Sequence, residues 1–315
     1  MTPVRIGLIG LGKMGQNHLR VLSLLRGVEL AFVHDLDEAK AARTAQTHGA
    51  AWSADLATLL PQADAIVICT PTSTHADYVR QAAPHVRRMF VEKPLAHTLE
   101  ETTSLAAFAA DERIDLQIGF IERFNPAVQQ LGAILAKSER VVSLDFTRTN
   151  KLSARITDVD VVTDLMIHDI DLALHLNGPV ADVSAHGLAD GPMINFASAM
   201  LTHENGRFSR IQASRITDKK MRLIEATCTD MFVRCELLRK ELQIDRQSEI
   251  QQEEGEPYTI SALGQTVEVP PQEALLSELQ SFVARCRGTV ASGPGIDDAV
   301  RAAEVCDRIQ REILA

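Results

Sequence analysis

A glycine-rich hexapeptide near the start of the chain has the residue types and spacing that can hold a dinucleotide. It matches the pattern G-x-G-x-x-G between a strand-like run and a helical pattern, and it reads Gly10-Leu11-Gly12-Lys13-Met14-Gly15. Gly10 permits a tight turn, Gly12 lets the backbone approach a pyrophosphate, and Gly15 lets helix and strand pack closely. The N-terminus of such a helix also offers N–H groups and partial positive charge to phosphates. The hexapeptide, with Lys13 and Met14 in it, is therefore a candidate cofactor site.

An acidic residue follows the next predicted strand. Asp35 stands twenty residues after Gly15. An acid at this place accepts hydrogen bonds from ribose hydroxyls and repels a 2′-phosphate, which predicts NAD rather than NADP as the cofactor. Asp37 is a second candidate for the same role. The alternative is that Asp35 caps a helix in a doubly wound protein of another kind.

A polar loop follows the third apolar strand. Strand ends in a parallel sheet lie at the ligand crevice, so we expect this loop to pass over the cofactor. A helix cap by Thr72 or Ser73, with His75 in the first turn, is compatible with that role. The candidate residues of the loop are Thr70, Pro71, Thr72 and His75.

A stripe of polar side chains marks one face of a helix expected at 160–176. At about 100° per residue, the stripe contains Asp164, His168, Asp171 and His175. The rest of the helix is mostly apolar, and a polar stripe is costly to bury unless it serves a site. A solvated face and a metal site are the alternatives. No third metal ligand stands at a recognisable spacing, so we expect no metal.

A basic segment without acids is the candidate seat for a diphosphate. It spans 146–156 in a chain of negative net charge, and its cations are Arg148, Lys151 and Arg155. Arg123 can add a fork-shaped contact. The alternative is a solvated basic loop.

Strand-like and helical patterns alternate through the first 120 residues, which predicts a parallel sheet with helices on both faces. The expected strands are 4–9, 28–34, 65–69, 89–91 and 116–119, and the helical patterns include 14–26, 37–48, 75–84 and 98–111. This is the pattern of a Rossmann doubly wound fold in an α/β protein, so we assign 1–120 to an NAD-binding domain.

The pattern changes after residue 120, where longer runs with polar alternation predict an open, mainly antiparallel sheet. After a helix at 125–137, these runs are 140–149, 181–189, 193–203, 207–215, 221–228 and 230–236. The charged segment 246–256 is expected to be an exposed connector, and two helices, 272–287 and 296–313, end the chain. We assign 121–315 to an α+β substrate-binding and oligomerisation domain, whose last helix can pack back on the first domain.

Composition and charge limit the partners. The 315 residues carry a formal net charge of −10, and nucleic-acid binding needs a basic face, so no nucleic acid is expected. No run approaches the ~18 apolar residues of a membrane span, and no export leader is recognisable. The five cysteines are scattered and form no CxxC pair, which favours free thiols in a cytoplasmic protein over a disulfide framework or a zinc site.

The tripeptide Glu92-Lys93-Pro94 follows a short apolar strand. Taken with the glycine loop and Thr70-Pro71-x-x-x-His75, it resembles the Gfo/Idh/MocA family of oxidoreductases, and the resemblance covers nearly the whole chain. It implies that Lys93 is catalytic and lies beside the nicotinamide and the reacting hydroxyl, with Glu92 at the cofactor and a cis bond before the proline. A second family signature, Asp-x-x-x-His-x-x-Asp, implies that Asp164 and His168 are catalytic as well.

The segment Glu122-Arg123-Phe124-Asn125-Pro126 narrows the resemblance. With the 158–171 pattern, it looks like the UDP-N-acetylglucosamine 3-dehydrogenase branch, whose members oxidise the C3 hydroxyl of the sugar to a ketone. This implies that Glu122, Arg123 and Asn125 bind a UDP-sugar. It also implies functional coupling to an aminotransferase that makes a 3-amino sugar for lipid A, lipopolysaccharide or another surface glycan. Family members commonly pair through the open sheet, which implies a homodimer or homotetramer.

The resemblance implies a mechanism in which His168, oriented by Asp164, accepts the C3-hydroxyl proton while hydride moves to the nicotinamide. Lys93 hydrogen-bonds the same oxygen and stabilises its developing negative charge, and Lys93 and His168 could exchange roles. The alternatives are an NAD-dependent dehydrogenase of another sugar or polyol such as inositol, an NAD-recycling glycosidase, and a non-enzymatic NAD-responsive regulator. The intact set of three residues argues against the regulator.

Overall fold

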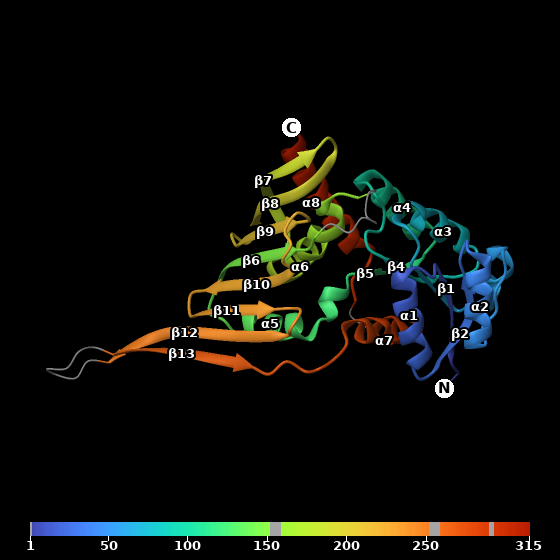
Figure 1. Ribbon diagram of the computed structural model, residues 1–315, viewed down its shortest axis with the longest axis horizontal. Coiled ribbons are helices and arrows are strands. Elements are labelled where there is room, and N and C mark those ends of the chain that lie inside the picture. The colour runs from blue at the N-terminus through green and yellow to red at the C-terminus, as the bar shows by residue number, and fades with distance from the viewer. Residues whose placement is uncertain (1, 152–158, 252–258, 290–292) are drawn as a thin grey trace. The chain divides into compact units, whose positions relative to one another are not determined.

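The computed structural model describes residues 2–151, 159–251, 259–289 and 293–315. The chain forms two compact units (Figure 1). The first comprises Met1–Phe124 and Glu273–Glu304, and the second comprises Asn125–Gln272 and Val305–Ala315. The last boundary therefore falls inside a single helix, α8 (Ile296–Leu314).

A five-stranded parallel sheet forms the centre of the first unit. In the order in which they pair, its strands are β2 (Val28–His34), β1 (Val4–Ile9), β3 (Ala65–Ile68), β4 (Arg88–Glu92) and β5 (Asp115–Gly119). The central strands are almost entirely apolar and buried, as strands covered on both faces must be. The Rossmann-type sheet that the sequence predicts is confirmed.

Helices cover both faces of this sheet. They are α1 (Lys13–Leu24), α2 (Glu38–His48), α3 (His75–Ala82), α4 (Leu99–Asp111) and α7 (Ala274–Cys286). The chain leaves β1 toward β2 in one direction and continues from β3 to β4 and β5 in the other. Because such crossovers are right-handed, the two directions place their helices on opposite faces. The reversal between β1 and β3 is the point at which sheets of this kind bind ligands.

The helix α7 packs with the first unit although it follows the second unit in the sequence. Its buried side chains join the hydrophobic cluster that α1 and α2 form over the sheet, and Phe282 lies edge-on to Phe90 of β4 with ring centroids 5.8 Å apart. The sequence assigns everything after residue 120 to a second domain and lets the last helix pack back on the first. In the structure the segment Glu273–Glu304 packs with the first unit, because the apolar face of α7 completes this cluster.

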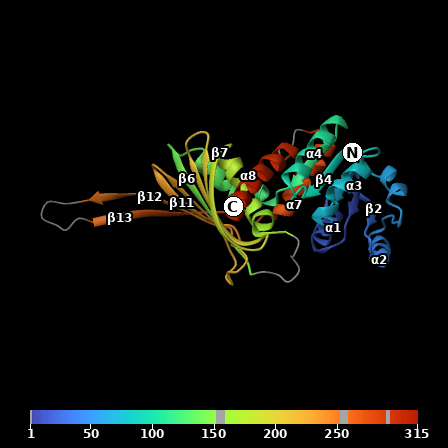
Figure 2. The same ribbon diagram turned by 90° about the horizontal axis from the view of Figure 1, so that it is seen from above.

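An eight-stranded sheet forms the second unit. In pairing order, its strands are β13 (Thr259–Val267), β12 (Glu241–Gln251), β11 (Met231–Glu236), β10 (Met221–Cys228), β6 (Val141–Thr149), β9 (Phe208–Ser214), β8 (Met193–His203) and β7 (Val180–Asp190). β6 and β9 pair in parallel, and the other neighbours are antiparallel. The open, mainly antiparallel sheet that the sequence predicts is confirmed, and Figure 2 shows its strands from above.

One face of this sheet is covered and the other is open. The helices α5 (Pro126–Leu135) and α6 (Ile167–Asn177) contact β6, β9, β11 and β12. Alternate side chains such as Leu144, Ile211 and Ile224 are fully buried on the covered face. Their neighbours Asp145 and Arg210 point to the other face, as the period of two residues requires.

One local expectation is wrong. The charged composition of 246–256 predicts a connector, but Arg246–Gln251 belongs to β12 and pairs with β13, because backbone hydrogen bonds there do not depend on apolar side chains. Residues 252–256 lie outside the described residues. The helix expected at 160–176 is confirmed, and it contains a π-helical turn, Val162–Met166, that leads directly into α6.

The five cysteines have free thiols, as the sequence predicts. Cys286 is partly exposed and the other four are buried. Within the described ranges, no helix combines the length and apolar character that crossing a membrane requires.

Candidate active site

The glycine loop joins β1 to α1 with a geometry that excludes side chains at two positions. Gly10 has φ +92°, and a Cβ there would lie 2.8 Å from the carbonyl oxygen of Cys69. A Cβ on Gly15 would lie 1.9 Å from the carbonyl oxygen of Gly10, so α1 packs directly against the end of β1. A Cβ on Gly12 would meet no described atom within 4 Å. The open space at Gly12 is a cradle where a pyrophosphate can approach the first turn of α1.

The start of α1 is arranged for a ligand rather than for a side-chain cap. Its N-cap residue is Gly12, which provides no side-chain hydrogen bond. The side chains of Lys13 and Met14 are exposed beside the loop. The loop therefore fits the phosphates of NAD, as its sequence predicts.

Asp35 holds the glycine loop from the end of β2. Its Oδ2 accepts a hydrogen bond of 2.7 Å from the backbone N–H of Leu11, and its Oδ1 accepts one of 2.9 Å from the N–H of Asp37. Each carboxylate oxygen has further acceptor capacity for a ribose hydroxyl. Asp37 has a different task, since it caps α2 by accepting from the N–H of Lys40. The alternative that Asp35 is merely a helix cap is therefore wrong.

The loop after β3 is tied to the loop after β4 through His75. The ring nitrogens of His75 lie 2.9 Å from the carbonyl oxygen of Thr70 and 3.0 Å from that of Pro94. Burial lowers the pKa of His75 below its usual 6.5, although the same carbonyl contacts act in the opposite direction. Pro71 and Thr72 lead into a short 3₁₀ turn, Thr72–Thr74, and no side-chain cap starts α3, so the expected cap by Thr72 or Ser73 is wrong.

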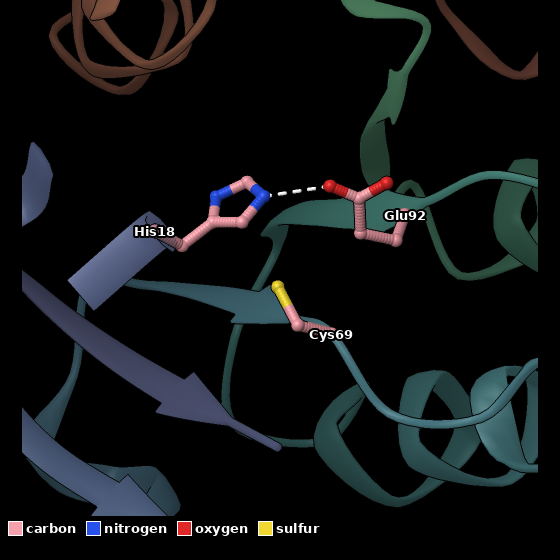
Figure 3. A group of neighbouring side chains, drawn as sticks. All are labelled: His18, Cys69 and Glu92. Atoms are coloured by element: carbon pink, nitrogen blue, oxygen red, sulfur yellow. Dashed lines mark hydrogen bonds and ion pairs between the residues drawn. The ribbon is translucent and has the colours of Figure 1, made fainter. Parts of the chain in front are cut away.

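Glu92, Lys93 and Pro94 follow at the carboxyl end of β4. The Lys93–Pro94 peptide bond is cis, as the family resemblance implies. Glu92 forms an ion pair with His18 of α1, with 2.6 Å between Oε1 and Nε2 (Figure 3). Sequence reasoning missed His18. The sequence does contain a signal for His18. It stands three residues after Gly15, and this spacing places His18 and Gly15 on the same, buried face of α1.

His18, Cys69 and Glu92 form a close group that has the residue types of a metal site (Figure 3). The distance of 2.6 Å between the imidazole nitrogen and the carboxylate oxygen is that of a charge-assisted hydrogen bond. Two ligands on one zinc ion, each about 2.0 Å from it, would stand farther apart. Burial also raises the pKa of the Cys69 thiol well above 9.0, which opposes the thiolate that a metal needs. This geometry fits a hydrogen-bonded group.

In the second unit, the four polar residues predicted to form one stripe differ in helix type and in exposure. Asp164 lies in the π-helical turn, so its direction does not follow the regular spacing used for the prediction. Asp164 and His168 are half-buried, Asp171 is buried, and His175 is exposed. The alternative of a uniformly solvated face is therefore wrong.

Arg215 is a second residue that sequence reasoning missed. It follows β9 and is buried, and its guanidinium lies 3.3 Å from Asp164 Oδ2 and donates to the carbonyl oxygen of Asp160 over 2.8 Å. A buried cation in this place holds the Asp164 carboxylate toward the start of the helix. The pairing joins residues 51 positions apart, and no local pattern in the sequence signals it.

The structure does not bring the described cations of the basic segment, Arg148 and Lys151, together as the expected diphosphate site. Arg148 is 2% exposed and forms a bidentate ion pair with Asp169, with distances of 2.8 Å and 2.7 Å, so its guanidinium is committed inside the second unit. The prediction for Arg148 needs this correction, because the sequence cannot reveal its buried partner on α6. Lys151 is exposed and lies 2.6 Å from Asp218. Arg155 lies outside the described residues.

The segment 121–126 has local structural tasks. Arg123 pairs with Asp298 at the start of α8 over 3.0 Å, within the first unit. Burial raises the pKa of Asp298, but Arg123, the N–H of Gly295 and Arg301 outweigh this and lower it. Asn125 caps α5 by accepting from the N–H of Ala127, and Glu122 is buried. A role of Glu122, Arg123 and Asn125 toward a sugar stays a prediction.

The structure thus brings the cofactor candidates together in one unit. Gly10–Gly15, Asp35, Thr70–His75 and Glu92–Lys93 all lie at the carboxyl ends of β1, β2, β3 and β4. Asp164, His168 and Arg215 belong to the second unit. Lys93 belongs to the first unit and His168 to the second, and the surroundings of each are described within its own unit.

Family profiles match both units. Residues 4–120 match the profile described as "Oxidoreductase family, NAD-binding Rossmann fold", and residues 141–234 match the "GFO/IDH/MocA C-terminal domain". A UDP-N-acetylglucosamine 3-dehydrogenase of Acidithiobacillus ferrooxidans is 31% identical over 289 residues, which cover 90% of this chain and 88% of that protein. An inositol 2-dehydrogenase of Rhizobium meliloti is 26% identical and covers 98% of this chain and 97% of its own.

Solved structures agree with these matches. The UDP-N-acetylglucosamine 3-dehydrogenase from Acidithiobacillus ferrooxidans superposes with a TM-score of 0.87 at 27% identity, covering 100% of this chain and 99% of its own. A levoglucosan dehydrogenase in complex with NADH shares the fold, with a TM-score of 0.82 at 20% identity over 99% and 97% of the two chains.

The preference for NAD is testable at Asp35. We expect Asp35→Asn to weaken NAD binding by about 10- to 100-fold, because one charge-assisted hydrogen bond contributes about 1.5–3 kcal/mol. Binding of NADP should improve, since the repulsion of its 2′-phosphate is removed. Titration calorimetry with both cofactors measures this. Asp37→Asn is the matched control and should keep the ratio of the two affinities, and an equal change in both variants would contradict the assignment.

Proposed function

The chain belongs to the Gfo/Idh/MocA family of NAD-binding oxidoreductases, and we propose that it oxidises the C3 hydroxyl of UDP-N-acetylglucosamine to the 3-keto sugar. The observation that carries this proposal is the likeness to a UDP-N-acetylglucosamine 3-dehydrogenase along nearly the full length of both chains. The segment Glu122–Pro126 has the form found in that branch.

In this proposal the candidate residues have different roles in one reaction. NAD, when bound along Gly10–Gly15 and Asp35, supplies the hydride acceptor. His168 accepts the proton of the C3 hydroxyl, and Asp164, held by Arg215, orients it. Lys93 donates a hydrogen bond to the same oxygen and stabilises the negative charge that develops there.

A polyol dehydrogenase is the second candidate. It is supported by the likeness to an inositol 2-dehydrogenase across almost the whole of both chains. Both candidates use the same cofactor and the same type of hydroxyl, so the residues that touch the cofactor do not distinguish them. The difference lies in recognition of a diphosphate, for which Lys151 and Arg155 remain the candidates of the basic segment.

We also propose a place for the product in a reaction sequence. A 3-keto UDP-sugar is the substrate type that an aminotransferase converts to a 3-amino sugar. We place the protein before such an enzyme, in a route to lipid A, lipopolysaccharide or another surface glycan.

We also propose that the protein is a homodimer or homotetramer that pairs through the open face of the second sheet. Exposed apolar side chains on this face, Met200, Phe208 and Phe232, stand beside a row of ion pairs. The row joins Arg210 to Asp145 and Arg234 to Glu225 across neighbouring strands. Apolar patches rimmed by polar groups are typical of interfaces.

The substrate is tested by incubating the protein with NAD and a panel of UDP-sugars and myo-inositol while NADH formation is followed. We expect kcat/KM for UDP-N-acetylglucosamine to exceed that for every other member by about tenfold or more. Preference for inositol would favour the second candidate. Release of free sugar without net NADH would instead favour a glycosidase.

The roles of Lys93 and His168 are tested by substitution. Lys93→Met and His168→Asn should each lower kcat by about 10²- to 10⁴-fold and leave NAD affinity nearly unchanged. The controls Lys137→Met and His85→Asn alter exposed residues and should retain activity. Turnover near that of the wild type in Lys93→Met or His168→Asn would refute the assignment.

The interface is tested with the double variant Phe208→Glu and Phe232→Glu. We expect light scattering after size exclusion to give an oligomer for the wild type and a monomer for this variant, because buried unpaired carboxylates are strongly disfavoured. Leu36→Glu, at an exposed apolar residue of the first unit, is the control and should keep the oligomer. An oligomer that survives the double variant would place the interface elsewhere.

A further inference from the structure

A chain of contacts leads from the helix that packs on the glycine loop to the candidate catalytic lysine. His18 lies three residues after Gly15 on α1, and its side chain is fully buried. Its Nε2 lies 2.6 Å from Oε1 of Glu92. The other carboxylate oxygen, Oε2, accepts a hydrogen bond of 3.2 Å from the backbone N–H of Lys93. One carboxylate therefore connects His18 to the backbone of Lys93. Figure 3 shows its contact with His18.

Packing leaves this carboxylate little freedom. A Cβ on Gly119 of the neighbouring strand would lie only 2.8 Å from Oε2, so β5 closes one side. The ring of His18, which contacts the carboxylate, packs against Phe90 with centroids 5.1 Å apart. The side chain of Glu92 is 12% exposed. The carboxylate is held in one place beside the backbone that carries Lys93.

The surroundings favour a charged Glu92. Burial raises its pKa, but the hydrogen bond from His18 and the positive charge of Lys93 outweigh burial, and the pKa of Glu92 lies below its usual 4.5. The interaction is reciprocal, since a lysine that stabilises the carboxylate is itself stabilised as an ammonium by the same free energy. Loss of the negative charge would therefore favour the neutral amine.

Other titratable groups lie around this pair. The Cys69 thiol stays protonated because burial raises its pKa, with Glu92 and Glu278 of α7 adding to the effect. Burial lowers the pKa of His75, and its hydrogen bonds with the carbonyl groups of Thr70 and Pro94 act in the opposite direction. Among these described groups, Glu92 is the carboxylate bonded directly to the Lys93 backbone.

We propose that His18 is a positioning residue for Lys93: by holding Glu92 in place as a carboxylate, it keeps the lysine in its ammonium form. Resting on the proposed function, this assigns the hydrogen-bond donor to Lys93 and the proton acceptor to His168. A bound NAD would supply the acceptor for the C3–H hydride and for the two electrons that the sugar loses. His168 takes the hydroxyl proton, and Lys93 keeps its protons.

The test measures the protonation of Lys93 without substrate or cofactor. Trace acetylation with acetic anhydride across a range of pH, read by mass spectrometry of the peptide that contains Lys93, gives the pH midpoint of amine reactivity. We expect a midpoint above about pH 9 in the wild type, so that the ammonium dominates near neutrality. In His18→Leu and Glu92→Gln it should fall by about one pH unit or more, the usual effect of an opposite charge at close range.

Two further variants separate positioning from general loss of structure. His18→Gln can place an amide N–H near the position of Nε2 and should restore the midpoint. His203→Leu removes a buried, hydrogen-bonded histidine from the second unit and should leave the midpoint unchanged. Glu92→Gln is close to isosteric and serves if His18→Leu does not fold.

The proposal is overturned if the midpoint is unchanged in Glu92→Gln, if it is already near neutrality in the wild type, or if His203→Leu moves it equally. With an active sugar, the alkaline limb of the kcat/KM profile should shift in His18→Leu by the same amount as the labelling midpoint. A labelling shift without turnover of UDP-N-acetylglucosamine would refute the proposed substrate and leave the role of His18 intact.

Discussion

The contact between α1 and the end of β1 leaves no room for a side chain at Gly15, and the rest of the first unit depends on it. The contact sets the direction of α1, whose first turn then faces the open space at Gly12. The same helix carries His18 to Glu92. A single glycine therefore positions both the cradle for the phosphates and the carboxylate next to Lys93, and a bulkier residue would displace both together.

Buried ion pairs recur where the candidate catalytic residues are fixed. Glu92 is paired with His18, Asp164 with Arg215, and Asp169, which follows His168 in the chain, with Arg148. A buried charge costs free energy unless it is paired, so each pair restricts its members to one geometry. Buried pairs are weak sources of stability, but they orient the groups that they hold.

Much of the fold could be predicted because it depends on local sequence patterns. The glycine loop, the acid after β2 and the alternation of strand and helix depend on residues close in the sequence. The partner of Arg148 could not be predicted, because Asp169 lies on another element. The π-helical turn at Asp164 and the pairing of β12 with β13 were missed for a related reason, since periodicity and composition do not report backbone hydrogen bonds.

The central claim is that hydride leaves C3 of a UDP-linked N-acetylglucosamine, and it is tested most directly with substrate that carries deuterium at C3. The account predicts that deuterium appears in the reduced cofactor and that turnover slows when hydride transfer limits the rate. Formation of reduced cofactor without deuterium, with the label retained in the sugar, would place the oxidation at another carbon and contradict the account.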